Sequence, residues 1–243
     1  MTRDSARRFW LAIAAGIALT AAAVLLGNWQ TRRGHEKEAR QIQWERAGNA
    51  NPVSLQTDSE LEAATGQLPL RVALRGEFDP RATIFADNRA LDGIAGFQVV
   101  TPLRLANGTA VLINRGWLAR DPADPARLPS LETPRGVVQV EGLAVPRVPR
   151  LLELAATPLA PPPAIWPNVE FEDVERATGM RLARFVVQQT TASGDGLRRV
   201  WTPPATGVEK HWGYALQWYG LATLSAALTA FFGGRALLRK GSG

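Results

Sequence analysis

The sequence predicts an α+β membrane protein in which two transmembrane α-helices bracket a mainly antiparallel β domain with one or two helices. Three observations predict it: an uncharged apolar run near each end, period-two alternation of apolar residues between them, and an Asn-Gly turn signal between two strand-like runs. The expected segments are a cytoplasmic N-terminus (1–8), transmembrane helix 1 (9–31), an extracytoplasmic β-rich domain (32–210), transmembrane helix 2 (211–234) and a cytoplasmic C-terminus (235–243).

The two apolar runs, residues 9–31 and 212–234, contain no charged residue. Each is longer than the roughly 20 helical residues that cross a bilayer core. Trp and Tyr residues lie at their boundaries, as in interfacial aromatic belts. We therefore expect both runs to span a membrane.

The first run has a competing interpretation as a cleaved signal peptide, with Arg7 and Arg8 as its charged region and Ala21 to Ala23 as an imitation of a cleavage site. Those alanines lie inside an apolar run that continues past them, which favours a retained span. Basic residues before the first run and after the second fit cytoplasmic ends, although Arg32 and Arg33 follow the first run just as closely.

The middle of the chain carries the strand signals. Residues 70–78 alternate between apolar and polar side chains, which is the period of a half-buried strand. Further strands are expected at 83–86, 98–105, 109–117, 137–143 and 184–190. Asn107-Gly108 predicts a type I′ hairpin turn, because both residues readily take positive φ. A short helix is expected at 170–178 and an irregular Pro-rich loop at 145–163.

Composition excludes several functions. The net charge of +6 is dispersed, without the basic stripe or aromatic signature of a nucleic-acid-binding protein, so no nucleic acid partner is expected. The absence of cysteine excludes disulfides, thiolate metal sites and cysteine nucleophiles. The only histidines, His35 and His211, flank the two runs, and no hydrolase or nucleotide-binding motif occurs, so we do not expect an enzyme.

His211 is the most informative candidate site residue. It stands at the start of the second run, and helical periodicity places Tyr214 and Trp218 on or beside its face. A neutral imidazole there can ligate haem iron, with Trp218 packed on the macrocycle. An interfacial histidine bonded only to water or lipid headgroups is the alternative, and spacing alone favours that alternative.

Four sequence blocks resemble the Surfeit locus protein 1 family of cytochrome oxidase assembly factors, in family order: LGNWQTRRGHEK (26–37), DNRALDGIAGFQVVTPL (87–103), LINRGWL (112–118) and HWGYALQWYGLA (211–222). The resemblance implies two spans around an extracytoplasmic domain, in a bacterial inner membrane, with both termini cytoplasmic and the central domain periplasmic. Ala119 stands where the family often has Pro, which affects only local loop geometry.

The resemblance further implies transient binding of haem a, with His211 as ligand to the iron, and assistance of its insertion into subunit I of cytochrome c oxidase. Implied partners are subunit I, haem a synthase and the lipid bilayer. The implied cofactor-binding residues are His211, Trp218, Tyr214 and Arg115.

Arginines are candidates for the haem propionates, because guanidinium groups suit carboxylates. The candidates are Arg33, Arg89 and Arg115, which lie in the matching blocks. The alternative is that Arg89 and Arg115 brace the domain and Arg33 faces headgroups. Two other functions stay open: a structural chaperone of oxidase subunits that never touches haem, and a membrane-tethered envelope or sensor domain unrelated to respiration.

Overall fold

The computed structural model describes residues 3–152, 158–201, 203 and 207–241, which form two compact units. One unit is a pair of long helices (residues 1–42 and 204–243), and the other is a β-rich domain (residues 43–203). Residues 153–157 of the expected Pro-rich loop, and the outermost residues of the two expected cytoplasmic ends, lie outside the described ranges.

The first helix, α1 (Arg3–Asn49), begins with the apolar run and continues well past it. No proline interrupts residues 3–49, so the helix ends only at the Asn-Ala-Asn-Pro segment. Among the described residues, α1 is the one helix long and apolar enough to cross a membrane, with a mean hydropathy of 2.3 in its most apolar window. The last helix is α4 (Val208–Gly241).

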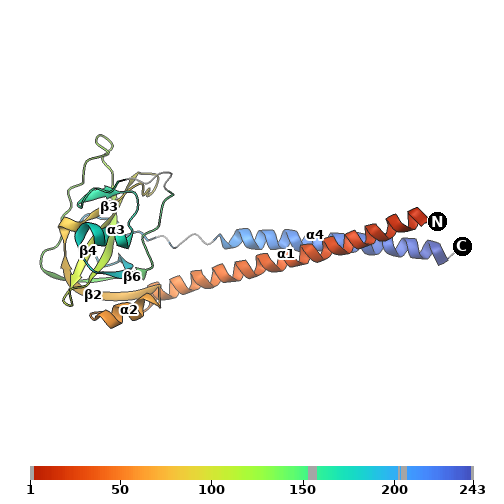
Figure 1. The fold of residues 1–243 in the computed structure, drawn as a ribbon, viewed down its shortest axis with the longest axis horizontal. Coiled ribbons are helices and arrows are strands. Elements are labelled where there is room, and N and C mark those ends of the chain that lie inside the picture. Colours follow the sequence, from red (N-terminus) through yellow and green to blue (C-terminus); the bar gives the residue numbers. More distant parts are fainter. Residues whose placement is uncertain (1–2, 153–157, 202, 204–206, 242–243) are drawn as a thin grey trace. The chain divides into compact units, whose positions relative to one another are not determined.

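The described residues of the domain form eight strands, two α-helices and a short 3₁₀ helix. They are β1 (Val53–Ser54), α2 (Asp58–Thr65), β2 (Leu70–Phe78), η1 (Pro80–Ala82), β3 (Ile84–Ala86), β4 (Gly96–Leu105), β5 (Ala110–Ala119), β6 (Val137–Val145), β7 (Ala164–Trp166), α3 (Phe171–Thr178) and β8 (Leu182–Gln189) (Figure 1). The strands expected between residues 70 and 190 and the helix at 170–178 are confirmed to within a few residues. The sequence analysis missed β1, α2 and β7.

The sheet closes on itself. Its order is β1-β2-β6-β8-β5-β4-β3-β7, and β2 also pairs with β4, so β2, β6, β8, β5 and β4 form a barrel. Among the described pairings β1–β2, β3–β7 and β5–β8 are parallel and the rest antiparallel. The α+β class is therefore confirmed, and the sheet is more mixed than the sequence predicted.

β4 lets the barrel close because it changes partner along its length. Residues 98–100 pair with β3, and Leu103 to Leu105 pair with β2. Pro102, which has no N–H to donate, lies between the two pairings.

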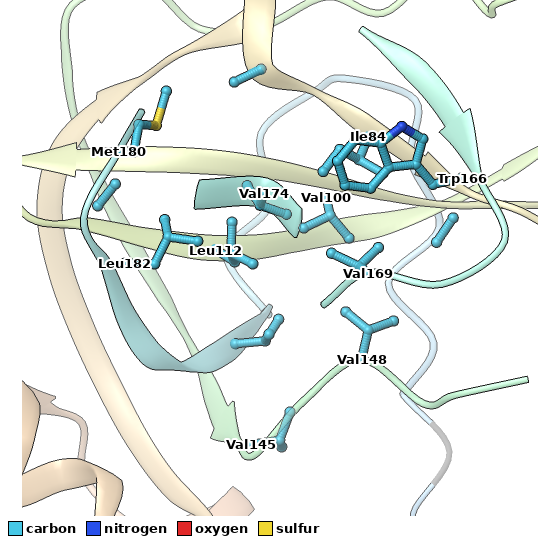
Figure 2. Packing of buried hydrophobic residues seen from close by; sticks show 14 of the residues in the cluster. Ile84, Val100, Leu112, Val145, Val148, Trp166, Val169, Val174, Met180 and Leu182 are labelled. Atoms are coloured by element: carbon cyan, nitrogen blue, oxygen red, sulfur yellow. The ribbon is translucent and has the colours of Figure 1, made fainter. Parts of the chain in front are cut away.

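Among the described residues the domain has three apolar clusters, and the two largest lie on opposite faces of the sheet. The interior core draws on all five barrel strands and includes Leu74, Leu103, Ile113, Val140 and Phe185. The outer core includes Val174 of α3 and Trp166 of β7, with Val100, Leu112 and Leu182 from the sheet (Figure 2).

The β4–β5 turn differs from the predicted type I′ turn. The Gly108 N–H donates to the Leu105 carbonyl at 3.0 Å, and of the Asn-Gly pair only Gly108 has a positive φ, of +83°. A type I′ turn needs positive φ at both central residues. The Asn107 side chain is instead used locally, because its Oδ1 accepts from the Thr109 N–H at 3.1 Å and its Nδ2 donates to Asp58 at 2.8 Å.

Candidate functional site

The two long helices pack against each other in antiparallel fashion (Figure 1). Thr20 meets Ser225, Gly27 meets Tyr219 and Gln30 meets His211, so the partner lies nearer the start of α4 as α1 advances, and His35 meets Trp212 near that same end of α4. The helix pair therefore brings residues of the two apolar runs, about 180 to 205 positions apart in sequence, into direct contact.

Small and polar side chains allow this close approach. Ala23, Ala215, Ala222 and Ser225 are buried, and the Ser225 hydroxyl donates to the Gly16 carbonyl at 3.1 Å. At Gly27 an added Cβ would lie 2.7 Å from the Tyr219 ring. A helix interface of this kind, with small residues and inter-helix hydrogen bonds, is typical of membrane helices.

His211 is held at this interface by one short hydrogen bond. Its Nδ1 lies 2.7 Å from Oε1 of Gln30 on α1. Among the described residues no hydrogen bond is formed to its Nε2. Within the part of the chain that the structure describes, Nδ1 is thus the ring nitrogen of His211 that forms a hydrogen bond.

Polar and aromatic contacts fix the helix pair on either side of that bond. Toward the N-terminus of α1, the Tyr219 hydroxyl donates to Oδ1 of Asn28 at 2.8 Å and lies 3.3 Å from the Thr31 hydroxyl. Toward the domain, the rings of His35 and Trp212 meet edge to face, with centroids 4.9 Å apart. The contact between Gln30 and His211 therefore lies between two other inter-helix contacts.

The other predicted haem-binding residues of α4 are not engaged in this interface in the same way. Tyr214 is exposed and Trp218 half-buried. Because Trp218 follows His211 by seven residues, both project from the same side of the helix. The prediction that they contact haem a stays a prediction.

The remaining predicted residue, Arg115, belongs to the other unit and is fully buried, with 0% of its side chain exposed. Its guanidinium donates to Asp195 at 3.0 Å, to the Thr133 hydroxyl at 2.8 Å and to the Glu132 carbonyl at 2.8 Å. The Phe78 ring lies beneath it, 5.1 Å from Cζ. These contacts are those of a residue that braces the domain; that it also binds a propionate stays a prediction.

Asp195 joins Arg115 to a second arginine. Arg199 donates to both Asp195 carboxylate oxygens, at 2.8 and 2.7 Å, and the Ser193 hydroxyl donates to one of them at 2.7 Å. Burial alone raises the pKa of Asp195, but the hydrogen bonds from Ser193 and Arg199 outweigh it and lower that pKa below its ordinary value. Burial lowers the pKa of Arg115, and the charge of Asp195 opposes that shift.

Three residues of the Asn-Arg-Gly-Trp motif, Arg115, Gly116 and Trp117, connect β5 to neighbouring loops. Gly116 has a φ of +144°, and an added Cβ would lie 3.0 Å from the Arg198 carbonyl, so the motif needs glycine here. Trp117 exchanges two backbone hydrogen bonds with Arg198, at 2.8 and 2.9 Å, and its indole donates to the Arg89 carbonyl at 2.6 Å. The motif therefore anchors the chain at residues 195–198, shortly before α4.

Arg89 is the least satisfied polar residue of this region. Only 8% of it is exposed, and its Nε and Nη2 have no hydrogen-bond partner among the described residues. Burial lowers its pKa. The described part of the chain has no group of three or more His, Cys, Asp or Glu residues that would hold a metal ion.

The candidate residues His211 and Arg115 were predicted from the sequence, but their hydrogen-bond partners were not. Gln30 appeared in the first matching block, but without a role, and Asp195 and Arg199 were not singled out. A signal was present in each case: an uncharged amide inside an apolar helix, and an Asp flanked by Ser193 and Arg199 in a loop. Neither pattern indicates which distant residue is the partner, His211 for Gln30 and Arg115 for Asp195.

Fold and site together define an α+β protein in which a closed barrel is joined to an antiparallel helix pair, one member of which is long and apolar enough to anchor it in a membrane. The model of the SURF1 family matches residues 17–223, and the chain belongs to this family, which confirms the resemblance found in the sequence.

A further comparison gives a shorter match. The chain is similar to a SURF1-like protein of Dictyostelium discoideum, at 37% identity over 59 residues. The alignment covers 24% of this chain and 22% of that protein, so the chain matches about a fifth of the relative's length.

Proposed function

We propose that this protein is a membrane assembly factor for haem-copper cytochrome c oxidase, which binds haem a through His211 and assists its insertion into subunit I. The observation that carries the proposal is the His211 ring, held by Gln30 at 2.7 Å with its Nε2 unbonded among the described residues. Membership of the SURF1 family supports the oxidase as the destination.

Haem a is cargo in this proposal, and its chemistry suits the site. Its iron takes an imidazole nitrogen as axial ligand, its farnesyl-bearing ring prefers an apolar surface, and its propionates prefer the polar boundary. His211 would supply the nitrogen, with Tyr214 and Trp218 beside the ring. Close to that end of α4, Leu216 is 75% exposed and offers apolar surface.

The proposal includes α4 as a second membrane span. Its outward residues are large and apolar, among them Leu224, Leu228, Phe231 and Phe232. Trp212, Tyr214, Trp218 and Tyr219 lower its hydropathy, but they are the residues that interfacial belts use. Because α1 and α4 are antiparallel, two crossings leave both termini on one side, which we assign to the cytoplasm, and the barrel in the periplasm of a bacterial inner membrane.

Topology is testable because the chain contains no cysteine. Single cysteines at Asp4, in the first turn of α1, and at Asn107, in the exposed β4–β5 turn, are treated in intact cells with a thiol reagent that cannot cross the membrane. Labelling of Asn107→Cys but not Asp4→Cys is expected. Equal labelling of both positions contradicts the assigned orientation.

Haem binding is tested with the full chain purified in detergent from cells that also make haem a. His211→Ala is expected to lose most of the bound haem, measured by absorbance. Lys210→Ala is the matched control, since Lys210 directly precedes His211 on α4 and is exposed. Equal haem content in wild type and His211→Ala removes the ligand claim.

The two alternative functions give different results in a deletion strain. A structural chaperone predicts lowered oxidase abundance although the purified protein is colourless. An envelope or sensor domain predicts normal oxidase activity and normal haem content. The haem proposal predicts oxidase that is made but deficient in haem a.

A further inference from the structure

The His211–Gln30 hydrogen bond carries information about where the imidazole proton sits. An amide oxygen only accepts hydrogen bonds, whereas a neutral imidazole has one N–H and one bare nitrogen. Oε1 of Gln30 lies 2.7 Å from Nδ1, and this contact is a hydrogen bond in the tautomer that carries its proton on Nδ1. The lone pair is then on Nε2.

This arrangement is the one that a metal-binding histidine needs. A ligating imidazole donates its other ring N–H to an oxygen acceptor, which fixes the ring orientation and makes the ligating nitrogen more basic. Solvated histidine otherwise favours the opposite tautomer, with the proton on Nε2. Among the described residues, Gln30 is the group bonded to the His211 ring, so the tautomer depends on it.

Gln30 is well placed to hold the ring firmly. It lies one turn from Gly27, where the Tyr219 ring packs too closely for a side chain, and Tyr219 is itself bonded to Asn28. On the other side, Trp212 follows His211 directly and meets the His35 ring edge-on. Inter-helix contacts made by neighbouring residues therefore flank the Gln30 amide and the His211 imidazole on both sides.

We propose that Gln30 is a positioning residue for His211: by accepting the Nδ1 proton it sets the ring orientation and the tautomer that leave Nε2 free to ligate iron. The ligand role of Nε2 rests on the proposed function, whereas the tautomer does not. Loss of such an outer partner lowers metal affinity by about 10- to 100-fold.

The tautomer is tested on the full chain in detergent without haem. With two histidines in the sequence, ¹⁵N-labelled histidine gives two ring systems, and His35→Ala assigns the signals of His211. We expect the Nδ1–H form in wild type, the same form in Gln30→Glu, and the Nε2–H form in Gln30→Leu. A wild-type His211 in the Nε2–H form, or a tautomer that Gln30→Leu leaves unchanged, overturns the proposal.

Haem a titration then separates this proposal from the proposed function. We expect Gln30→Leu to weaken binding about 10- to 100-fold, and Gln30→Glu to restore affinity and to raise the iron–histidine stretching frequency of the ferrous complex. Asn28→Leu, which removes the bond to Tyr219 from the same helix, is the control for a general disturbance of the helix pair. We expect it to leave that frequency unchanged.

The outcomes are distinguishable. If His211→Ala binds haem a as well as wild type does, the proposed function fails while the tautomer result stands. If His211→Ala loses haem but Gln30→Leu keeps the wild-type affinity and stretching frequency, the ligand is right and the positioning role is wrong. If Asn28→Leu matches Gln30→Leu in affinity and frequency, the effect belongs to helix packing and the positioning role is again wrong.

Discussion

Removal of the Asp195 carboxylate should destabilise the domain strongly. The Arg115 side chain is 0% exposed and the Asp195 side chain 2%, so neither charge is solvated by water in the folded state. In Asp195→Ala the guanidinium keeps only the uncharged acceptors Thr133 and Glu132, and Arg199 loses its carboxylate as well. Breaking a buried ion pair from one side costs about 3–5 kcal/mol.

That loss is a large share of the free energy of unfolding of a typical domain. Folded domains are stable by about 5–15 kcal/mol, so the variant should unfold at clearly lower denaturant concentration or be partly unfolded without any. The assay is urea unfolding of the full chain in detergent, in which pulse proteolysis measures the fraction of folded domain at each urea concentration. The substitution leaves the surface area exposed on unfolding nearly unchanged. The free energy of unfolding should therefore fall with urea concentration at the same slope, while the unfolding midpoint moves to lower urea.

A matched control separates the buried pair from ordinary surface charge. Glu172→Ala removes one of the two carboxylates that pair with Arg184, and the Glu172 side chain is 69% exposed. Exposed pairs contribute about 0–1 kcal/mol. If Asp195→Ala lowers the free energy of unfolding no more than Glu172→Ala does, the buried ion pairs of Asp195 with Arg115 and Arg199 do not hold residues 193–199 to β5.

Three further predictions concern acid, an unpaired arginine and the helix pair. Since the folded pKa of Asp195 is lowered, its contribution to stability is fully present above its unfolded pKa of about 4 and is lost as pH falls through the folded pKa; Asp195→Asn should flatten the loss of urea stability below about pH 4. Arg89→Met should leave the domain equally stable or about 1 kcal/mol more stable, because it removes a buried guanidinium whose Nε and Nη2 have no hydrogen-bond partner among the described residues; a loss above about 1 kcal/mol in urea unfolding contradicts this reasoning. The Thr20 and Ser225 hydroxyl oxygens are 3.1 Å apart, so Thr20→Cys/Ser225→Cys should form a disulfide on mild oxidation. Adding Gly27→Leu should lower the yield of that disulfide, because the new side chain would clash with the Tyr219 ring. If Thr20→Cys/Ser225→Cys forms no disulfide even without Gly27→Leu, the antiparallel pairing is contradicted.

Much of the local structure followed from short-range patterns. Alternation at 70–78 and the β-branched runs at 96–119 gave strands close to those observed, because side-chain period is a property of the strand itself. The capped helix α2 was missed although Thr57 and Glu60 form a capping box, a signal that is readable in Thr-Asp-Ser-Glu. The strands β1 and β7 are two and three residues long, too short for any periodicity to mark.

The sequence by itself determined the class of protein, the apolar runs, the central strands and the histidine worth testing. Only the tertiary structure decided the barrel closure, since it depends on β4 changing partner at Pro102. It also decided which residues meet: Gln30 with His211 across 181 positions, and Arg115 with Asp195 across 80. Periodicity reports which side of an element a residue occupies, but a hydrogen bond between distant elements depends on packing that no local pattern records.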